Sequence, residues 1–276
     1  MEGNLDVLEE LDYPHAPVVE VVLSVQFEKL LDLDSPRIGL YWSSVRGRFP
    51  FAEQHPPQPP IQEIFAPPES APRALRIELT DAVPTPRFWL LNQDRSQLIQ
   101  IQDDRFSHNW RKKVSPYPHY ETVRDAFTDE LVAFDGFLRD QGIGPLVPNQ
   151  CEVTYINHVS IPPGRTTADI GDLLTTWSGR FNDEPQALPE DAFVHLRLRI
   201  TGADDAPLGR VHVDLQPAFS HDVLRPIWVL SLTARGRPFS QDIPGAIAFL
   251  NLGREHVLRT FVGVTSSDRQ EEWDRP

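Results

Sequence analysis

Amide, cationic and aromatic side chains gather within residues 96–113, whose sequence is SQLIQIQDDRFSHNWRKK. A side-chain amide can both donate and accept hydrogen bonds, which suits it to recognise a peptide or the edge of a nucleic-acid base. Aromatic and arginine side chains often dominate the energy of a protein interface. These residue types predict a binding surface that also takes in two tyrosines further along the chain. Its members are Gln100, Gln102, Asn109, Trp110, Arg111, Tyr117 and Tyr120.

A structural role accounts for the same stretch. Residues 96–110 alternate like a strand, in which successive side chains point to opposite faces. In that phase Gln100 and Gln102 share the less apolar face. Trp110 and the two tyrosines would then fill the junction between a sheet and the next helix, while Asn109 caps a turn.

A second polar cluster lies on three expected strands in the C-terminal half. One interpretation is a basic ligand-binding face that includes Arg197, Arg199 and Arg235. Another is a metal site, because imidazole and carboxylate suit transition metals, although no HExxH pattern supports it. The candidate metal ligands are His195, His212 and Asp214. Cross-strand pairs on a solvated sheet face explain the same residues.

Catalytic and nucleotide-binding patterns are missing from the sequence. It contains neither the GxSxG of a nucleophile elbow nor the GxxxxGK[ST] of a phosphate-binding loop. The single cysteine, Cys151, begins an expected strand, and nothing around it suggests a reactive thiolate. We therefore expect no cofactor and no catalytic residue.

Charge and composition limit the classes of partner. The chain has 276 residues, is 40% hydrophobic and carries a formal charge of -14, so phosphate backbones and anionic membranes are poor default partners. A single cysteine excludes an intrachain disulfide and fits a reducing cytosol. The acidic N-terminal residues do not resemble a signal peptide, and the apolar runs are too short to span a bilayer. The sequence therefore predicts a cytoplasmic protein that does not bind membranes.

Hydrophobic periodicity predicts the same order of elements twice. In the first half we expect a strand at 17–30, a helix at 35–49 with Ser35 as N-cap, and a proline-rich surface loop. Three strands and a helix follow. The loop, these strands and the helix are expected at 50–72, 74–80, 87–93, 96–110 and 120–139. In the second half a strand, a helix, three strands and a closing helix are expected at 151–161, 166–178, 192–201, 209–219, 226–236 and 242–264.

This repeated strand-helix-three strands-helix unit predicts an α+β fold, with one curved antiparallel sheet and helices on one face. TATA-binding-like saddles have a comparable order of elements, which is an analogy of topology only. The expected divisions are an acidic N-terminal segment, two halves and a C-terminal tail, at residues 1–16, 17–147, 148–265 and 266–276. Trp273 in the tail would either pack back on the body or reach a partner subunit.

Several stretches resemble a sporadically distributed family of uncharacterised bacterial proteins of about this length. They are YPHAPVVEVVLSVQF, LIQIQDDRFSHNWRK followed by YPHY, VTYINHV and REHVLRTFVGVTSSDRQEEW. That family has no assigned activity to transfer. Its patchy distribution implies horizontally transferred gene neighbourhoods, associated with defence or toxins.

Three functions follow as hypotheses. The first is a non-catalytic binding protein that holds a protein partner, favoured because strong catalytic motifs are missing. The second is nucleic-acid binding across the sheet through the arginines of the second cluster together with Gln100 and Gln102, and the third is a metal-dependent hydrolase that uses His195, His212 and Asp214. Long edge strands also make a homodimer a reasonable expectation.

Overall fold

The computed structural model describes residues 15–65, 85–113, 115–178, 189–220 and 224–274. The strand expected at 74–80 lies outside these ranges. The strands are β1 (Val18–Phe27), β2 (Phe51–His55), β3 (Arg87–Leu91), β4 (Gln97–Gln102), β5 (Arg105–Arg111), β6 (Pro148–Ser160), β7 (Val194–Thr201), β8 (Pro207–Phe219) and β9 (Pro226–Gly236). The helices are α2 (Ser35–Val45), α3 (Tyr120–Asp140), α4 (Ile243–Val264) and α5 (Ser267–Glu272), with a 3₁₀ turn η1 (Ile170–Asp172).

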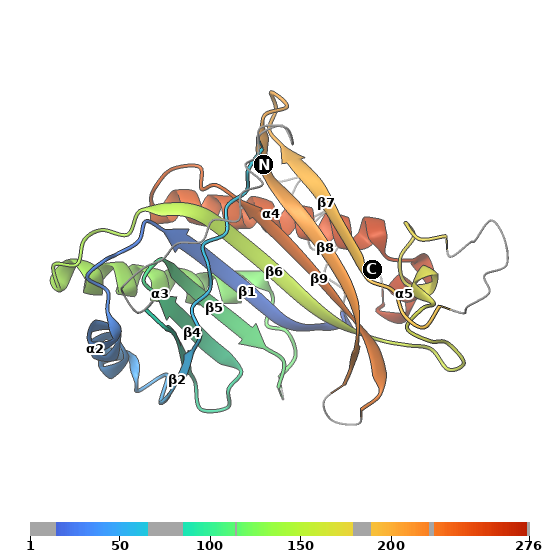
Figure 1. Cartoon of the computed structure of the whole chain (residues 1–276), viewed down its shortest axis with the longest axis horizontal. Helices are drawn as coiled ribbons and strands as arrows, with labels where there is room; N and C mark the ends of the chain where they lie inside the picture. The colour runs from blue at the N-terminus through green and yellow to red at the C-terminus, as the bar shows by residue number, and fades with distance from the viewer. Residues whose placement is uncertain (1–14, 66–84, 114, 179–188, 221–223, 275–276) are drawn as a thin grey trace.

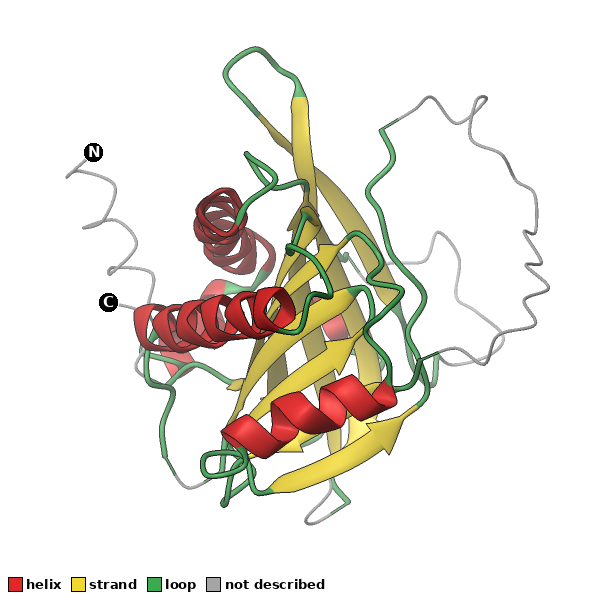
Figure 2. Ribbon diagram, turned by 90° about the vertical axis from the view of Figure 1, so that its left-hand side faces the viewer, coloured by secondary structure: helices red, strands yellow, loops and turns green. Residues whose placement is uncertain are grey.

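The strands form one sheet of nine, in the order β2-β3-β4-β5-β1-β6-β9-β8-β7, and the paired neighbours are antiparallel. The sheet is continuous because β1 pairs with β6 at its centre. Figure 2 shows the sheet twisted and curved, with the two long helices α3 and α4 on the same side. The α+β class and the curved antiparallel sheet are therefore confirmed.

The long helices form where their apolar residues recur at helical spacing. The predicted stripe of α3 is buried against the sheet, including Val123, Phe127 and Leu131. Helix α4 begins where the Asp242 carboxylate accepts a hydrogen bond from the Gly245 amide, as the cap predicted from the sequence should. Gly253 brings α4 close to β6, because a Cβ there would lie 2.8 Å from Val153.

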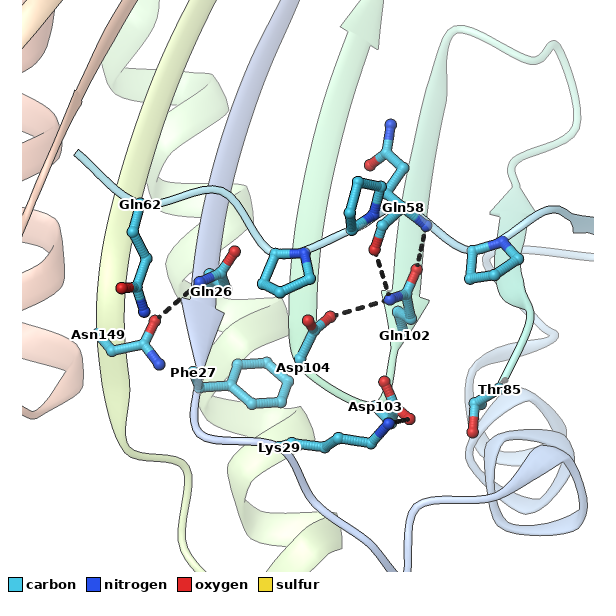
Figure 3. A pocket seen from close by; sticks show the side chains of 13 residues that line it. Gln26, Phe27, Lys29, Gln58, Gln62, Thr85, Gln102, Asp103, Asp104 and Asn149 are labelled. Carbon is cyan, nitrogen blue, oxygen red and sulfur yellow. Dashed lines mark hydrogen bonds and ion pairs between the residues drawn. The ribbon is translucent and has the colours of Figure 1, made fainter. Parts of the chain in front are cut away.

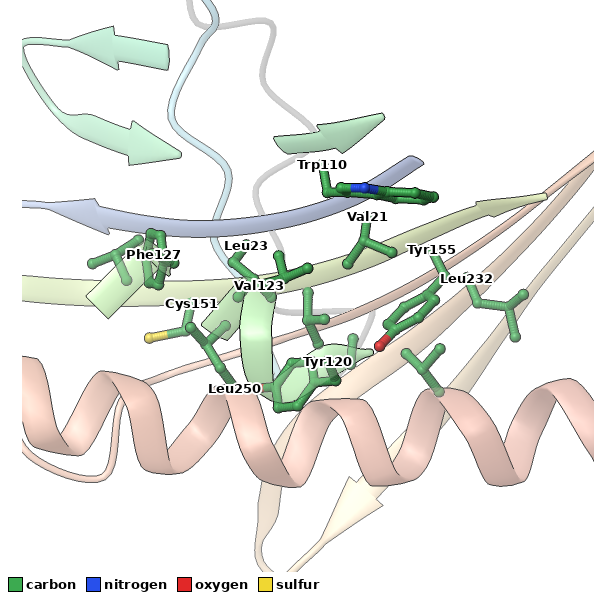
Figure 4. Close-up of a cluster of buried hydrophobic side chains, with 14 of the residues drawn as sticks. Val21, Leu23, Trp110, Tyr120, Val123, Phe127, Cys151, Tyr155, Leu232 and Leu250 are labelled. Carbon is green, nitrogen blue, oxygen red and sulfur yellow. The ribbon is translucent and has the colours of Figure 1, made fainter. Parts of the chain in front are cut away.

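The two faces of the sheet differ in chemistry because side chains alternate along each strand. On β1, the residues Val21, Leu23 and Val25 point to the helices and are fully buried. Figure 4 shows this apolar side packed against α3 and α4. The opposite side of the sheet, here called the open face, carries Ser24 and Gln26 of the same strand. It is this side that holds the polar side chains discussed below.

Four local expectations are wrong. The stretch 96–110 is a hairpin rather than one strand, because the chain turns at Asp103 and Asp104 between β4 and β5. The N-cap of α2 is Asp34 rather than Ser35. The expected helix at 166–178 forms only the 3₁₀ turn η1.

The fourth error is the proline-rich loop expected at 50–72. Its first residues form β2, which pairs with β3 at the edge of the sheet. The tail, in contrast, packs on the body through α5, and the Trp273 ring lies 5.2 Å from that of Phe261. Within the described ranges, no helix has both the length and the apolar character needed to cross a bilayer.

Candidate binding site on the open face of the sheet

The strand register gathers most of the predicted binding residues on the open face. Residues directly opposite one another in an antiparallel pair lie on the same face. Cross-strand pairs therefore connect one row of residues on this face. The row begins at Arg199 on β7, reaches Arg235 on β9, continues across β6, β1 and β5, and ends at Gln100 on β4. The predicted residues on this face are Gln100, Gln102, Asn109, Arg111, Arg197, Arg199 and Arg235.

The three predicted aromatic residues lie on the other side of the sheet, in the core. Trp110 is buried, and its ring makes an edge contact with Tyr117 at 5.1 Å. The Tyr120 hydroxyl donates a hydrogen bond of 3.0 Å to Asn251 on α4. Figure 4 places Trp110 and Tyr120 among the buried apolar side chains. This arrangement matches the structural role, in which these residues fill the junction between the sheet and α3.

On the open face, a series of side-chain hydrogen bonds links β4, β5 and β1. The Gln100 amide donates to Asn109 at 2.8 Å, and the Asn109 amide donates to the Glu20 carboxylate at 2.6 Å. Arg111 donates to the same carboxylate at 3.0 Å and lies 4.9 Å from the ring of Trp89. We call these five residues the Trp89 cluster. The ring of His55 stacks on Trp89 from the side of β2, at 3.9 Å between centroids.

Sequence reasoning missed Trp89 and Glu20. The signal for the tryptophan in the sequence is weak, because in strand phase Trp89 lies between the polar Arg87 and the apolar Leu91. Its indole Nε1 is buried without a hydrogen-bond partner among the described residues. A buried donor of this kind costs free energy unless it is satisfied.

An extended segment crosses the open face. Residues 56–65, with the sequence PPQPPIQEIF and here called the strap, leave β2 and run over β4, β5, β1 and β6. Figure 1 shows the strap in front of the strands and the helices α3 and α4 behind them. The prolines explain its lack of regular structure, since proline removes a donor and favours an extended conformation.

Glutamine side chains from three strands hold the main chain of the strap. Gln102 on β4 accepts from the Gln58 amide at 2.8 Å and donates to the Gln58 carbonyl at 2.9 Å. Gln26 on β1 accepts from the Ile61 amide at 2.9 Å. On β6, Gln150 accepts from the amide of residue 63 at 3.3 Å. The open face therefore recognises the strap largely through its backbone.

Glu63 is the anchor at the far end of the strap. Its buried carboxylate accepts hydrogen bonds from Arg210 and from His212 Nε2, the latter at 2.6 Å, and Arg235 lies 3.5 Å away. Burial by itself would raise the pKa of Glu63, but the hydrogen bonds from His212 and Arg210 outweigh it and lower the pKa to about 2. The carboxylate is therefore ionised at neutral pH. We call Arg210, His212 and Arg235 the carboxylate site.

A hollow of about 550 Å³ lies under the first part of the strap. Figure 3 shows Gln102, Asp103 and Asp104 in its wall, with Gln26 and Asn149 on the other side. Burial raises the pKa of Asp104, which accepts a hydrogen bond of 3.1 Å from Gln102. Polar side chains and the prolines of the strap both line the hollow, and the strap covers it without filling it.

The three candidate metal ligands do not converge on one point. His195 Nδ1 lies 2.5 Å from Asp214, while His212 is turned to Glu63. Across the described ranges, no group of three or more His, Cys, Asp or Glu side chains is placed to hold a metal ion. Burial raises the pKa of the Cys151 thiol, which keeps it protonated at neutral pH.

Carboxylates neutralise much of the expected basic face. Arg235 donates to Glu152 at 2.5 Å, Arg210 binds Glu63 and Arg111 binds Glu20. Arg197 and Arg199 on β7 are exposed, and within the described ranges neither forms an ion pair. Arg197 and Arg199 on the edge strand are therefore available to meet an anion.

Comparisons with known proteins identify no relative. No family model, no curated protein and no solved structure matches this chain.

Proposed function

We propose that this chain is a non-catalytic protein-binding module that holds an extended segment of a protein partner on the open face of its sheet. One observation carries the proposal: the face already holds an extended polypeptide, its own strap, through glutamine side chains that pair with the main chain. An extended segment has unpaired amide and carbonyl groups along its length, and side-chain amides can satisfy both kinds.

The Trp89 cluster is the part of the open face that we expect the partner to contact beside the strap. It combines an aromatic ring, an arginine and amides, the residue types enriched where interfaces are strongest. The cytosolic setting suggested by the composition and the defence-associated setting implied by the family resemblance stay part of this proposal.

Nucleic-acid binding is the second candidate, supported by the exposed Arg197 and Arg199 on β7. The pairing of Arg111, Arg210 and Arg235 with carboxylates weakens it, because a paired arginine offers little net charge to a phosphate. The formal charge of -14 weakens it further.

We also infer that the two halves of the sheet descend from one duplicated unit. In the first half β1 pairs with β5, β5 with β4 and β4 with β3; in the second, β6 pairs with β9, β9 with β8 and β8 with β7. The same order of pairing in both halves, around a central β1–β6 pair, is what a duplication would produce. The likeness to TATA-binding-like saddles stays an analogy of element order.

Affinity capture of tagged protein from the host tests the function. The informative variant is Gln100→Ala/Arg111→Ala in the Trp89 cluster, and the matched control is Arg197→Ala/Arg199→Ala on the same face. We expect the wild type and the control to retain one stoichiometric protein that the cluster variant loses, with the fold of both variants checked by circular dichroism. Nucleic acid that copurifies with the wild type and is lost only in the control variant would favour the second candidate instead.

A further inference from the structure

We propose that the strap is a built-in ligand, and that the site beneath it also receives an extended, proline-containing segment of a partner protein with a glutamate at the position of Glu63. This inference rests on the proposed function and names the class of its partner. The occupied site has two parts: the glutamines that pair with a main chain, and the carboxylate site of Arg210, His212 and Arg235.

The strap is not part of the hydrophobic core. Of its ten residues, only Glu63 is buried. The side chains of Ile61 and Ile64 are 39% and 62% exposed, although they are the aliphatic residues that a structural cover would be expected to bury. Because apolar burial is the main force that fixes a segment permanently, the polar attachment of the strap makes it replaceable.

The contacts made by the glutamines do not depend on the side chains of the strap. Gln26, Gln102 and Gln150 pair with amide and carbonyl groups that any extended chain presents at the same spacing. Prolines favour an extended conformation before binding and so reduce the entropy lost on binding. Recognition of a backbone by these glutamines accordingly selects for extended, proline-rich segments without specifying most of their sequence.

The carboxylate site adds the selectivity. The planar guanidinium of Arg210 donates through Nη1 to the Glu63 carboxylate and through Nη2 to the carbonyl oxygen of Ile64, and it lies 4.2 Å from the ring of Phe65. Arg235 is held in place by Glu152 from the neighbouring strand. A segment without an acidic residue would leave Arg210 desolvated and without a carboxylate partner, which opposes its binding.

The strap also underfills the surface that it crosses. The hollow under its first part measures about 550 Å³, and a second hollow of about 610 Å³ lies beside residues 62–65, next to Leu208 and Phe239. A partner segment with larger side chains at these two places would gain contacts that the strap does not make. Such a partner needs this gain, because the tether holds the strap at an effective concentration on the order of millimolar.

A fluorescent peptide with the strap's own sequence, PPQPPIQEIF, tests the inference in trans by anisotropy against the full chain. In Glu63→Ala the strap lacks its anchor, while the peptide supplies the carboxylate. We expect this variant to bind the peptide roughly 10- to 100-fold more tightly than the wild type, the range for a hydrogen bond to a charged group. The same peptide with glutamine in place of its glutamate is the matched control and should lose that gain, as should Glu63→Ala/Arg210→Ala.

A second variant covers the case in which the strap of Glu63→Ala still occupies the site and competes with the peptide. Replacing residues 56–65 by a glycine-serine segment of equal length removes the competing ligand altogether. If this variant is folded and binds the peptide no more tightly than the wild type, the inference is overturned. It is also overturned if the glutamine peptide binds as tightly as the glutamate peptide.

The outcomes separate this inference from the function on which it rests. A partner captured through the Trp89 cluster, with no peptide binding by either strap variant, would retain the binding module and overturn the exchangeable strap. Peptide binding with no partner lost from the Trp89 cluster variant would support the strap site and overturn the placement of the partner at that cluster. Strap exchange between two copies of the chain, seen as a dimer of the wild type, would overturn the assignment to a different protein.

Discussion

The two sides of the sheet are covered in opposite ways, although the same strands supply both. On β1, Val21, Leu23 and Val25 lie under α3 and α4, while Ser24 and Gln26 face the strap. The helices are attached by fully buried apolar side chains and the strap by amides and one carboxylate. The helices are therefore part of the hydrophobic core, whereas the strap is a bound segment that belongs to the same chain.

The magnitudes of the two attachments differ accordingly. Burying one large apolar side chain stabilises the fold by about 1.5–3 kcal/mol. A hydrogen bond in water contributes only about 0.5–1.5 kcal/mol net, because the unbound groups pair with water. Substitutions can weaken the attachment of the helices and of the strap separately, and we expect them to lower the free energy of unfolding by very different amounts.

The largest effect is expected on the helix side. Phe127 on α3 is fully buried, and its ring lies 6.2 Å from that of Phe106 on β5. Phe127→Ala should lower the free energy of unfolding by about 3–5 kcal/mol through lost burial and the cavity that remains. Urea denaturation measures it, with the exposed Val132→Ala of the same helix as control, expected to change stability by less than about 0.5 kcal/mol. If Phe127→Ala lowers the free energy of unfolding no more than the control does, the helix side of the sheet is not the hydrophobic core.

A smaller, pH-dependent effect is expected at His108, on the helix-facing side of β5 between Leu23 and Ile99. Burial, aided by the charge of Arg48, lowers the pKa of His108 to about 4 from 6.5. Below pH 6.5 the imidazole of His108 binds a proton in the unfolded chain but not in the folded chain. The stability present above pH 6.5 is therefore lost as pH falls towards 4. The loss should reach about 3 kcal/mol.

His108→Leu removes this proton linkage. Between pH 7 and pH 4, the unfolding free energy of the wild type should therefore fall by about 3 kcal/mol more than that of the variant. Chemical denaturation at a series of pH values provides the comparison, and parallel curves for the two proteins would contradict a buried neutral imidazole.

The smallest effect on global stability is expected at the strap. Glu63→Gln removes the charge that Arg210 and His212 bind, but the freed strap lets water reach both side chains, so the cost should stay below about 2 kcal/mol. Hydrogen exchange at residues 58–65 should rise strongly, whereas the exposed Gln62→Ala should leave it unchanged. A global loss as large as that of Phe127→Ala would show that both covers are structural.

The same anchor has its own pH window. Because the pKa of Glu63 is lowered to about 2 from 4.5, its stabilising contribution is complete above pH 4.5 and is lost as pH falls towards 2. Protection of the amides of residues 58–65 from hydrogen exchange, corrected for the intrinsic pH dependence of the exchange rate, should therefore be retained at pH 5 and fall only below pH 4.5. If these amides already lose their protection at pH 5, the ionised carboxylate of Glu63 does not hold the strap in place.

Local patterns predicted the elements whose stability is set along the chain. The helices α3 and α4 and most strands appear where periodicity placed them, because burial of one face imposes a spacing on the residues themselves. The hairpin of β4 and β5 was missed, although the four consecutive polar residues 102–105 interrupt the alternation, because a turn of two residues leaves little signal. The missing helix at 166–178 shows that an amphipathic pattern alone does not guarantee a helix.

The sequence by itself determined the α+β class, the long helices and the alternation that makes one side of the sheet polar, because each depends on the spacing of neighbouring residues. Only the tertiary structure decided which polar residues meet. Gln102 and Gln150 reach the strap across 44 and 87 positions, and His212 reaches Glu63 across 149. Contacts at such separations depend on strand register and on the path of the strap, which no local pattern encodes.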